Sequence, residues 1–153
     1  MKRTVSLLLA LVMVFALAAC SKENNENKDD GSAGDVEMKY MTADETAAIL
    51  GTEGYTILDL RKSADYAEAH ITGAVSADMD AAVNGDAEAG KSTMKAAAEG
   101  LDDTLVLVCY SGKRYAQAAT NALSANGYDM SKVFTLEGGF NNWKEVQPDN
   151  VEP

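Results

Sequence analysis

The chain has 153 residues, with 24 acidic and 13 basic side chains and a formal net charge of −11 at pH 7. This acidity argues against a nucleic-acid partner and against electrostatic adhesion to anionic lipid. The part of the chain after residue 35 has the length of one globular domain.

The N-terminus is predicted to be an export signal. Two basic residues precede an apolar run at 5–16, which is too short to span a bilayer of about 30 Å comfortably. A permanent N-terminal anchor helix is the alternative, and the length of the run disfavours it. Residues 17–20 (Leu-Ala-Ala-Cys) resemble the lipobox of bacterial lipoproteins. This resemblance implies that residues 1–19 are removed and that Cys20 carries lipid, which would anchor the protein at the extracytoplasmic face of a cell membrane.

The remainder divides into three parts. Residues 20–35 are predicted to be the lipidated cysteine and a flexible tether, because this run has too few apolar side chains to fold. Residues 36–146 are expected to form the folded domain, and residues 147–153 a C-terminal tail. We expect the protein to be a monomer.

Short apolar strands alternate with amphipathic helices along the folded part. This alternation predicts an α/β fold with a mostly parallel central sheet flanked by helices on both faces. Thr42 and Glu45 form a capping-box signature before a helix that stops at Gly51, and Ser63 is expected to cap the next helix. We expect strands at 37–40, 55–59, 74–76, 104–108 and 133–136, and further helices at 63–69, within 78–100, at 113–125 and from 138 through 143.

Two polar residues mark the ends of strands. Asp59 ends the strand at 55–59, and Cys109 follows the strand at 104–108. In open α/β sheets the active crevice lies beyond the carboxyl ends of the strands. Both residues are therefore expected at the active edge of the sheet.

Cys109 stands where a strand becomes a helix, a position that favours the thiolate. The free N–H groups and positive dipole end of the helix, together with Lys113 and Arg114, stabilise negative charge there. A lipidated Cys20 would leave Cys109 without an intramolecular disulfide partner. A buried structural cysteine is the alternative, but the polar residues 110–114 argue against burial in apolar surroundings. The cationic pair beside the nucleophile indicates a small anionic substrate.

Three short motifs follow one another along the folded part. Residues 109–114 read Cys-Tyr-Ser-Gly-Lys-Arg, and residues 136–143 contain Gly-Gly followed four positions later by Trp143. Between residues 58 and 74 stand Asp-Leu-Arg, a tyrosine and His-Ile-Thr-Gly-Ala. In this order they resemble the rhodanese family of sulfurtransferases in its single-domain form, with its Cys-x-x-Gly-x-Arg active-site loop.

The resemblance implies a two-step exchange through Cys109 as the catalytic residue. The thiolate takes the outer sulfur of a donor such as thiosulfate, becomes a persulfide and passes the sulfur to cyanide or a thiol. Backbone N–H groups of the loop would stabilise the charged sulfur. Neither a metal nor an organic cofactor is required. The implied substrate- and persulfide-binding loop consists of Tyr110, Ser111, Gly112, Lys113 and Arg114.

Other residues are expected to support this loop. The resemblance implies that Asp59 and Arg61 are mainly structural, with Asp59 accepting hydrogen bonds that hold the loop. His70, the only histidine, is expected to hydrogen-bond between segments rather than act as a base. The chain departs from the family at Thr72, where proline is usual, and at Tyr115, where a small residue is usual. The bulk of Tyr115 either narrows the pocket or turns into the helix packing.

Three other functions use the same residues. A phosphatase would need five residues between cysteine and arginine, whereas four separate Cys109 from Arg114. A disulfide oxidoreductase would need a second cysteine where Gly112 stands. A non-catalytic rhodanese-like binding module or sulfur carrier at the cell surface is the main alternative, although such modules typically lose the cysteine or the arginine that this chain keeps.

Overall fold

The computed structural model describes residues 34–153. The expected signal peptide at 1–19, the lipidated Cys20 and the tether up to residue 33 lie outside the described residues. In the part of the chain that is described, no helix has the length and apolar character needed to cross a membrane.

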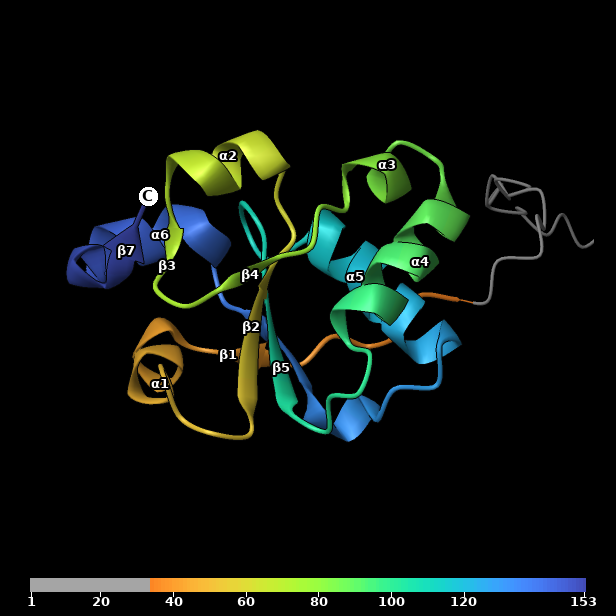
Figure 1. The fold of residues 1–153 in the computed structure, drawn as a ribbon, viewed down its shortest axis with the longest axis horizontal. Coiled ribbons are helices and arrows are strands. Elements are labelled where there is room, and N and C mark those ends of the chain that lie inside the picture. The colour runs from red at the N-terminus through yellow and green to blue at the C-terminus, as the bar shows by residue number, and fades with distance from the viewer. Residues whose placement is uncertain (1–33) are drawn as a thin grey trace, which may run out of the picture. The chain divides into compact units, whose positions relative to one another are not determined.

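A five-stranded sheet of parallel strands forms the centre of the domain (Figure 1). The strands are β1 (Tyr40–Met41), β2 (Tyr55–Asp59), β4 (Val75–Ser76), β5 (Thr104–Val108) and β6 (Val133–Leu136). The strand order β1-β6-β5-β2-β4 places β5 in the middle, where its continuous apolar run is covered on both faces. The predicted α/β fold with a mostly parallel sheet is confirmed. The first strand is shorter and later than expected.

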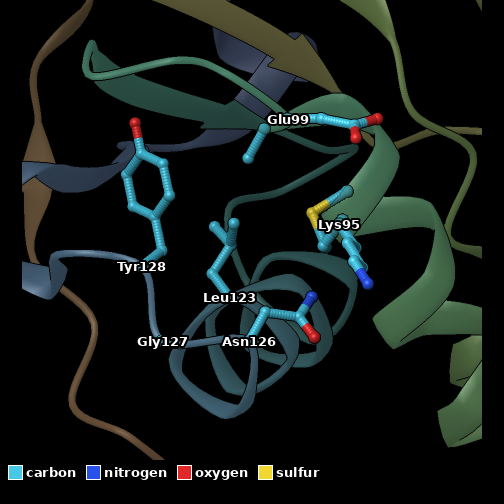
Figure 2. A pocket seen from close by; sticks show the side chains of 8 residues that line it. Lys95, Glu99, Leu123, Asn126, Gly127 and Tyr128 are labelled. Atoms are coloured by element: carbon cyan, nitrogen blue, oxygen red, sulfur yellow. The ribbon is translucent and has the colours of Figure 1, made fainter.

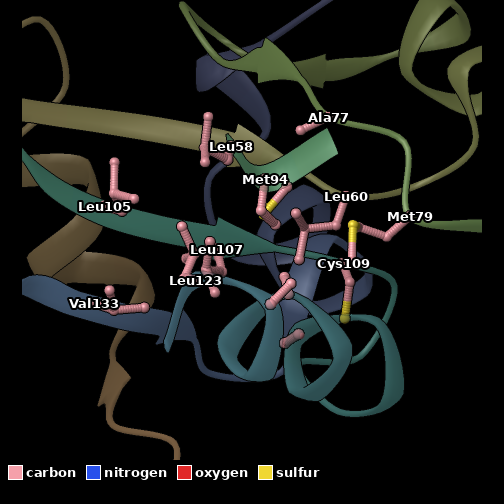
Figure 3. Packing of buried hydrophobic residues seen from close by; sticks show 13 residues of the cluster. Leu58, Leu60, Ala77, Met79, Met94, Leu105, Leu107, Cys109, Leu123 and Val133 are labelled. Atoms are coloured by element: carbon pink, nitrogen blue, oxygen red, sulfur yellow. The ribbon is translucent and has the colours of Figure 1, made fainter. Parts of the chain in front are cut away.

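Helices cover both faces of this sheet. They are α1 (Ala43–Ala48), α2 (Ser63–Glu68), α3 (Asp80–Val83), α4 (Ala87–Ala97), α5 (Arg114–Ala125) and α6 (Gly139–Val146). The strands alternate their side chains, so Leu105 and Leu107 of β5 join one buried cluster, which Figure 3 shows, while Val106 and Val108 join another around Trp143. The first cluster lies under α3, α4 and α5, and the second under α1, α2 and α6 (Figure 1).

The C-terminal residues belong to the folded domain rather than to a separate tail. β7 (Val151–Glu152) pairs antiparallel with β3 (His70–Ile71). The 3-10 helix η2 (Pro148–Asn150) leads into β7, and the Trp143 side chain donates to the carbonyl of Asn150 at 3.3 Å. Strands of two residues show no hydrophobic period, so the sequence pattern did not reveal this pairing. A second 3-10 helix, η1 (Met130–Lys132), precedes β6.

The starts of α1 and α2 are capped in different ways. The predicted capping box is present, because Thr42 and Glu45 exchange backbone-to-side-chain hydrogen bonds. The prediction that Ser63 caps α2 is wrong. Instead, the N–H and Oγ of Ser63 donate to the carboxylate of Asp78 at 2.8 and 3.0 Å. Burial alone would raise the pKa of Asp78, but these bonds and the N–H of Asp80 hold it below its usual range.

Candidate active site

Cys109 lies at the carboxyl edge of the sheet, between β5 and α5. Val108 pairs in register with Asp59 of β2, and the N–H of Leu60 donates to the carbonyl of Val108 at 2.7 Å. The sheet therefore brings the ends of both strands together. Asp59 and Cys109 stand at one edge, as the strand assignments predicted.

The side chain of Cys109 is buried, with only 1% of its surface exposed. It belongs to the cluster that also contains Leu60, Met79 and Ala116 (Figure 3). The expectation that it would avoid apolar surroundings is therefore wrong. Cys109 continues the alternation of Leu105 and Leu107 along β5, so it faces the same helices, and Met79 in the segment that leads into α3 lies beside it (Figure 3). The polar residues that follow in sequence turn toward the surface.

The loop after Cys109 presents a run of free backbone donors. Within residues 34–153, the N–H groups of Tyr110 through Lys113 donate no hydrogen bond to the protein. Gly112 has φ +70°, and a Cβ there would lie 2.7 Å from the carbonyl oxygen of Leu136. Glycine is therefore required for this turn. Successive free N–H groups before a helix of 12 residues form a site suited to an anionic sulfur or oxygen.

The start of α6 supports the loop from behind. The N–H of Phe140 donates to the carbonyl of Cys109 at 2.7 Å, and that of Asn141 to the carbonyl of Tyr110 at 3.1 Å. A Cβ at Gly139 would lie 2.3 Å from the Cys109 oxygen and 2.7 Å from the nitrogens of Ser111 and Gly112. The absence of a side chain at Gly139 therefore lets the backbone of α6 pack directly against the loop.

Asp59 and Arg61 form a buried ion pair. Arg61 Nη2 lies 2.6 Å from Asp59 Oδ2, and Nε donates to both carboxylate oxygens. The guanidinium also donates to the carbonyl of Ala69 and lies 3.7 Å from the centre of the Phe140 ring. The pair thus ties β2 to the end of α2 and to the helix behind the loop. Asp59 and Arg61 thus have a structural role, but the expectation that Asp59 would hold the cysteine loop itself is wrong, because in the described residues its carboxylate accepts hydrogen bonds only from Arg61.

We expect the variant Asp59→Asn to lose stability rather than catalytic function. Its side chain keeps the size of aspartate but leaves the Arg61 charge buried without a counter-ion, which costs about 3 kcal/mol. Urea unfolding measures this loss, with the exposed Asp149→Asn as the matched control. Unchanged stability combined with a large loss of activity per folded molecule would instead make Asp59 a catalytic residue.

The two basic residues of the loop are exposed. Lys113 and Arg114 lie at the start of α5, and both side chains reach the surface. The Arg114 guanidinium donates to the carbonyl of Val83 at the end of α3. Arg114 therefore connects α5 to α3 in this conformation, while its charge stays beside the loop.

Two tyrosines flank the buried cysteine. The Tyr110 hydroxyl donates to the carboxylate of Asp65, and the Tyr115 hydroxyl donates to Asp80 Oδ1 at 2.7 Å. Their rings meet edge to face, with centroids 5.3 Å apart. Burial, and then the bond to Asp80, raise the pKa of Tyr115 far above its usual value, so its hydroxyl stays a donor. Burial and the bond to Asp65 also raise the pKa of Tyr110 above its usual value.

Sequence analysis missed four residues at this site, namely Asp65, Asp78, Met79 and Asp80. The acidic ones resemble any solvent-exposed loop or helix start, and Met79 gave no pattern of its own. Asp65, Asp78 and Asp80 bind residues that lie 45, 15 and 35 positions away in the chain, respectively. One pattern could have drawn attention to them, because Asp78 and Asp80 lie on either side of the apolar Met79 shortly after the strand expected at 74–76.

His70 lies between segments, as predicted. Its Nδ1 is 3.0 Å from the carbonyl oxygen of Tyr66, and its ring stacks on the Tyr66 ring with centroids 3.9 Å apart. Its Nε2 is 3.5 Å from Glu152 of β7. These contacts fasten β3, in which His70 lies, to α2 and to the C-terminal strand β7.

A pocket of about 210 Å³ lies at the far end of α5, away from the cysteine (Figure 2). Its floor consists of the buried Met94 and Leu123, and Lys95, Glu99, Asn126 and Tyr128 surround it. The lining includes no residue of the Cys109 loop. In the described part of the chain, no group of three or more histidine, cysteine and carboxylate side chains is placed to hold a metal ion.

The match to a family model decides the classification. The model of the rhodanese-like domain matches residues 42–146. The chain belongs to the rhodanese family. Its cysteine loop, its buried ion pair and the helix behind the loop all lie within the matched residues.

Curated relatives agree with this assignment. A thiosulfate sulfurtransferase GlpE of Pseudomonas paraeruginosa is 34% identical over 106 residues, which are 69% of this chain and 84% of the relative. A protein of the same name from Pseudomonas entomophila is 32% identical over 104 residues, or 68% of this chain and 84% of the relative. This similarity supports a sulfurtransferase-type function for the rhodanese described here.

Solved structures show the same fold at lower identity. The rhodanese-like domain of Anabaena sp. Alr3790 superposes with a TM-score of 0.57 at 21% identity, covering 76% of this chain and 80% of that one. The As-Sb reductase of Leishmania major also gives a TM-score of 0.57, at 20% identity and with 75% and 85% coverage. At these identities the rhodanese fold alone is shared, because one fold carries different reactions.

Proposed function

We propose that this chain transfers sulfane sulfur from a small anionic donor to a thiophilic acceptor through a persulfide on Cys109. The observation that carries the proposal is the free N–H run from Tyr110 to Lys113 beside the cysteine. Such donors stabilise the negative charge on a thiolate and on the terminal sulfur of a persulfide. The exposed cations Lys113 and Arg114 attract an anionic donor to this point of an acidic protein.

In the first half-reaction the Cys109 thiolate attacks the outer sulfur of thiosulfate. The sulfur–sulfur bond of the donor breaks, and sulfite leaves with the electron pair. In the second half-reaction the carbon of cyanide attacks the outer sulfur of the persulfide. Thiocyanate leaves, and the electron pair of the broken bond restores the thiolate. Both steps are nucleophilic displacements at sulfur that need no outside oxidant or reductant.

Mass spectrometry tests this proposal directly. The full chain is incubated with thiosulfate, digested without reductant, and the peptide of residues 96–113 is weighed. We expect an adduct of about 32 Da, the mass of one sulfur atom, that cyanide removes with release of thiocyanate. Absence of the adduct from a folded protein would overturn the proposal.

A sulfur carrier that loads sulfur but does not pass it to cyanide is the second candidate, because it would use the same cysteine and loop. Such a carrier would gain the adduct and keep it when cyanide is added. The same experiment therefore separates a carrier from an enzyme.

We further propose that the protein is a lipoprotein that acts at the extracytoplasmic face of a membrane. The support is the lipobox-like sequence at residues 17–20 after an apolar run. Cells that express the full chain and are fed radioactive palmitate should label the protein, and Cys20→Ser should abolish the label. Equal labelling of both forms would overturn this localisation.

A further inference from the structure

We propose that Tyr115 determines substrate size at this site: its hydrogen bond to Asp80 holds α3 over Cys109 and restricts the reaction to compact donors and acceptors. The inference rests on the proposed sulfur transfer only for the identity of the reacting cysteine. Its subject is access to the sulfur atom, which can be measured whether or not sulfur is transferred.

The first step is the closure of the site. Cys109 is 1% exposed, and so is Met79, the residue directly before α3. Both belong to one buried cluster (Figure 3). A nucleophile that is covered in this way reacts only after the covering segment has moved. Met79 lies beside Cys109 in Figure 3 and α3 follows Met79 directly, so a shift of α3 would move this cover.

The second step is how α3 is held. This helix has four residues, and side chains from the first turn of α5 bind both of its ends. Tyr115 binds Asp80 at its start, and Arg114 binds the carbonyl of Val83 at its end. Ala82 of α3 also packs against Gly90 of α4, and Lys62 Nζ lies 3.6 Å from Asp80 Oδ1. The bond from Tyr115 is the hydrogen bond that ties the start of α3 to the helix following the cysteine loop.

The third step is the shape of the opening. The rings of Tyr110 and Tyr115 meet edge to face beside the loop, and their hydroxyls donate to Asp65 of α2 and Asp80 of α3. Two rings whose hydroxyls are held by hydrogen bonds leave a narrower path to the Cys109 sulfur than a single mobile side chain would. Thiosulfate and other donors with a few heavy atoms fit a partial opening, whereas peptide-sized persulfides and polycyclic reagents need α3 to detach.

Alkylation with two reagents of the same chemistry tests this inference. In each, the Cys109 sulfur displaces iodide from an iodoacetamide, and the second reagent carries a neutral pyrene ring. The full chain is used, and modification is read on the peptide of residues 96–113, so that Cys20 does not contribute. The measured quantity is the rate with the pyrene reagent divided by the rate with iodoacetamide.

In Tyr115→Phe, which keeps the ring and removes only the hydroxyl, this ratio should rise about tenfold. A tenfold change corresponds to about 1.4 kcal/mol, near the lower end of the range for a hydrogen bond to a charged acceptor. The matched control is Tyr128→Phe, whose hydroxyl binds the carbonyl of Asp103, and it should leave the ratio unchanged. Asp80→Ala, which removes the acceptor together with the Lys62 ion pair, should raise the ratio as well, and it provides the same test if Tyr115→Phe folds poorly.

An unchanged ratio in both folded variants would overturn the inference, and this includes the case in which both alkylation rates rise equally. The sulfur-loading experiment reports on the proposed function separately. A chain that gains no 32-Da adduct but shows the tenfold change in ratio would lose the proposed function and keep the size gate. A chain that gains the 32-Da adduct but shows no change in ratio would keep the proposed sulfur transfer and would show that Tyr115 does not determine substrate size.

Discussion

Cys109→Ser is expected to lower thiosulfate-dependent thiocyanate formation by about a thousandfold or more, to the background rate. Serine retains the shape of the side chain, but its hydroxyl does not ionise near neutral pH and oxygen does not form the persulfide. Loss of a covalent nucleophile typically removes several orders of magnitude of rate. The measurement is the initial rate of thiocyanate formation at equal concentrations of folded protein.

The control for this variant is its stability, because a hydroxyl placed in the apolar cluster around Cys109 costs about 1–3 kcal/mol when it lacks a hydrogen-bond partner. Cys109→Ala avoids that cost and should be equally inactive. Urea unfolding shows whether both variants fold. A folded serine or alanine variant that still forms thiocyanate would show that sulfur does not pass through Cys109.

Gly139→Ala is expected to lower the free energy of unfolding by about 4 kcal/mol or more and to abolish activity. The new Cβ would lie 2.3 Å from the Cys109 oxygen and 2.7 Å from two loop nitrogens, all of them backbone atoms that cannot rotate away. A φ of +60° adds the strain of a left-handed alanine. Either α6 or the cysteine loop must shift, and unfolding in urea together with the thiocyanate rate measures the result.

The matched control is Gly127→Ala. Gly127 has φ +79°, but nothing lies within 4 Å of the position that a Cβ would take there. An alanine at this position therefore has the backbone strain of about 1–2 kcal/mol but no steric overlap. If Gly139→Ala cost no more than this control, the close packing of α6 against the loop would not be required for the site.

The sequence was sufficient for most of the fold. The apolar runs of β2, β5 and β6 predicted their strands, and the capping box at Thr42 predicted the start of α1. These elements are encoded locally, by hydrophobic period and by side chains three residues apart. The pairing of β3 with β7 was missed because two-residue strands carry no such period.

The supporting contacts of the site depended on tertiary structure. Ser63 looked like a helix cap, yet the group that binds it is Asp78, which lies fifteen positions later in the chain. Cys109 looked exposed because its neighbours in sequence are polar, yet its neighbours in space include Met79 and Ala116. Local pattern cannot report which segment covers a strand end, because that depends on how the crossover between strands returns over the sheet.

The sequence by itself determined the α/β class, the cysteine at a strand-to-helix junction, the glycine in its loop and the family to which these belong. Each follows from residue type and spacing along the chain. Only the tertiary structure decided that Cys109 is buried in one cluster with Met79 and that Tyr115 and Arg114 bind the two ends of α3. Those contacts join residues more than thirty positions apart, whose approach is fixed by the packing of α3 on α5 and not by any local preference of either helix.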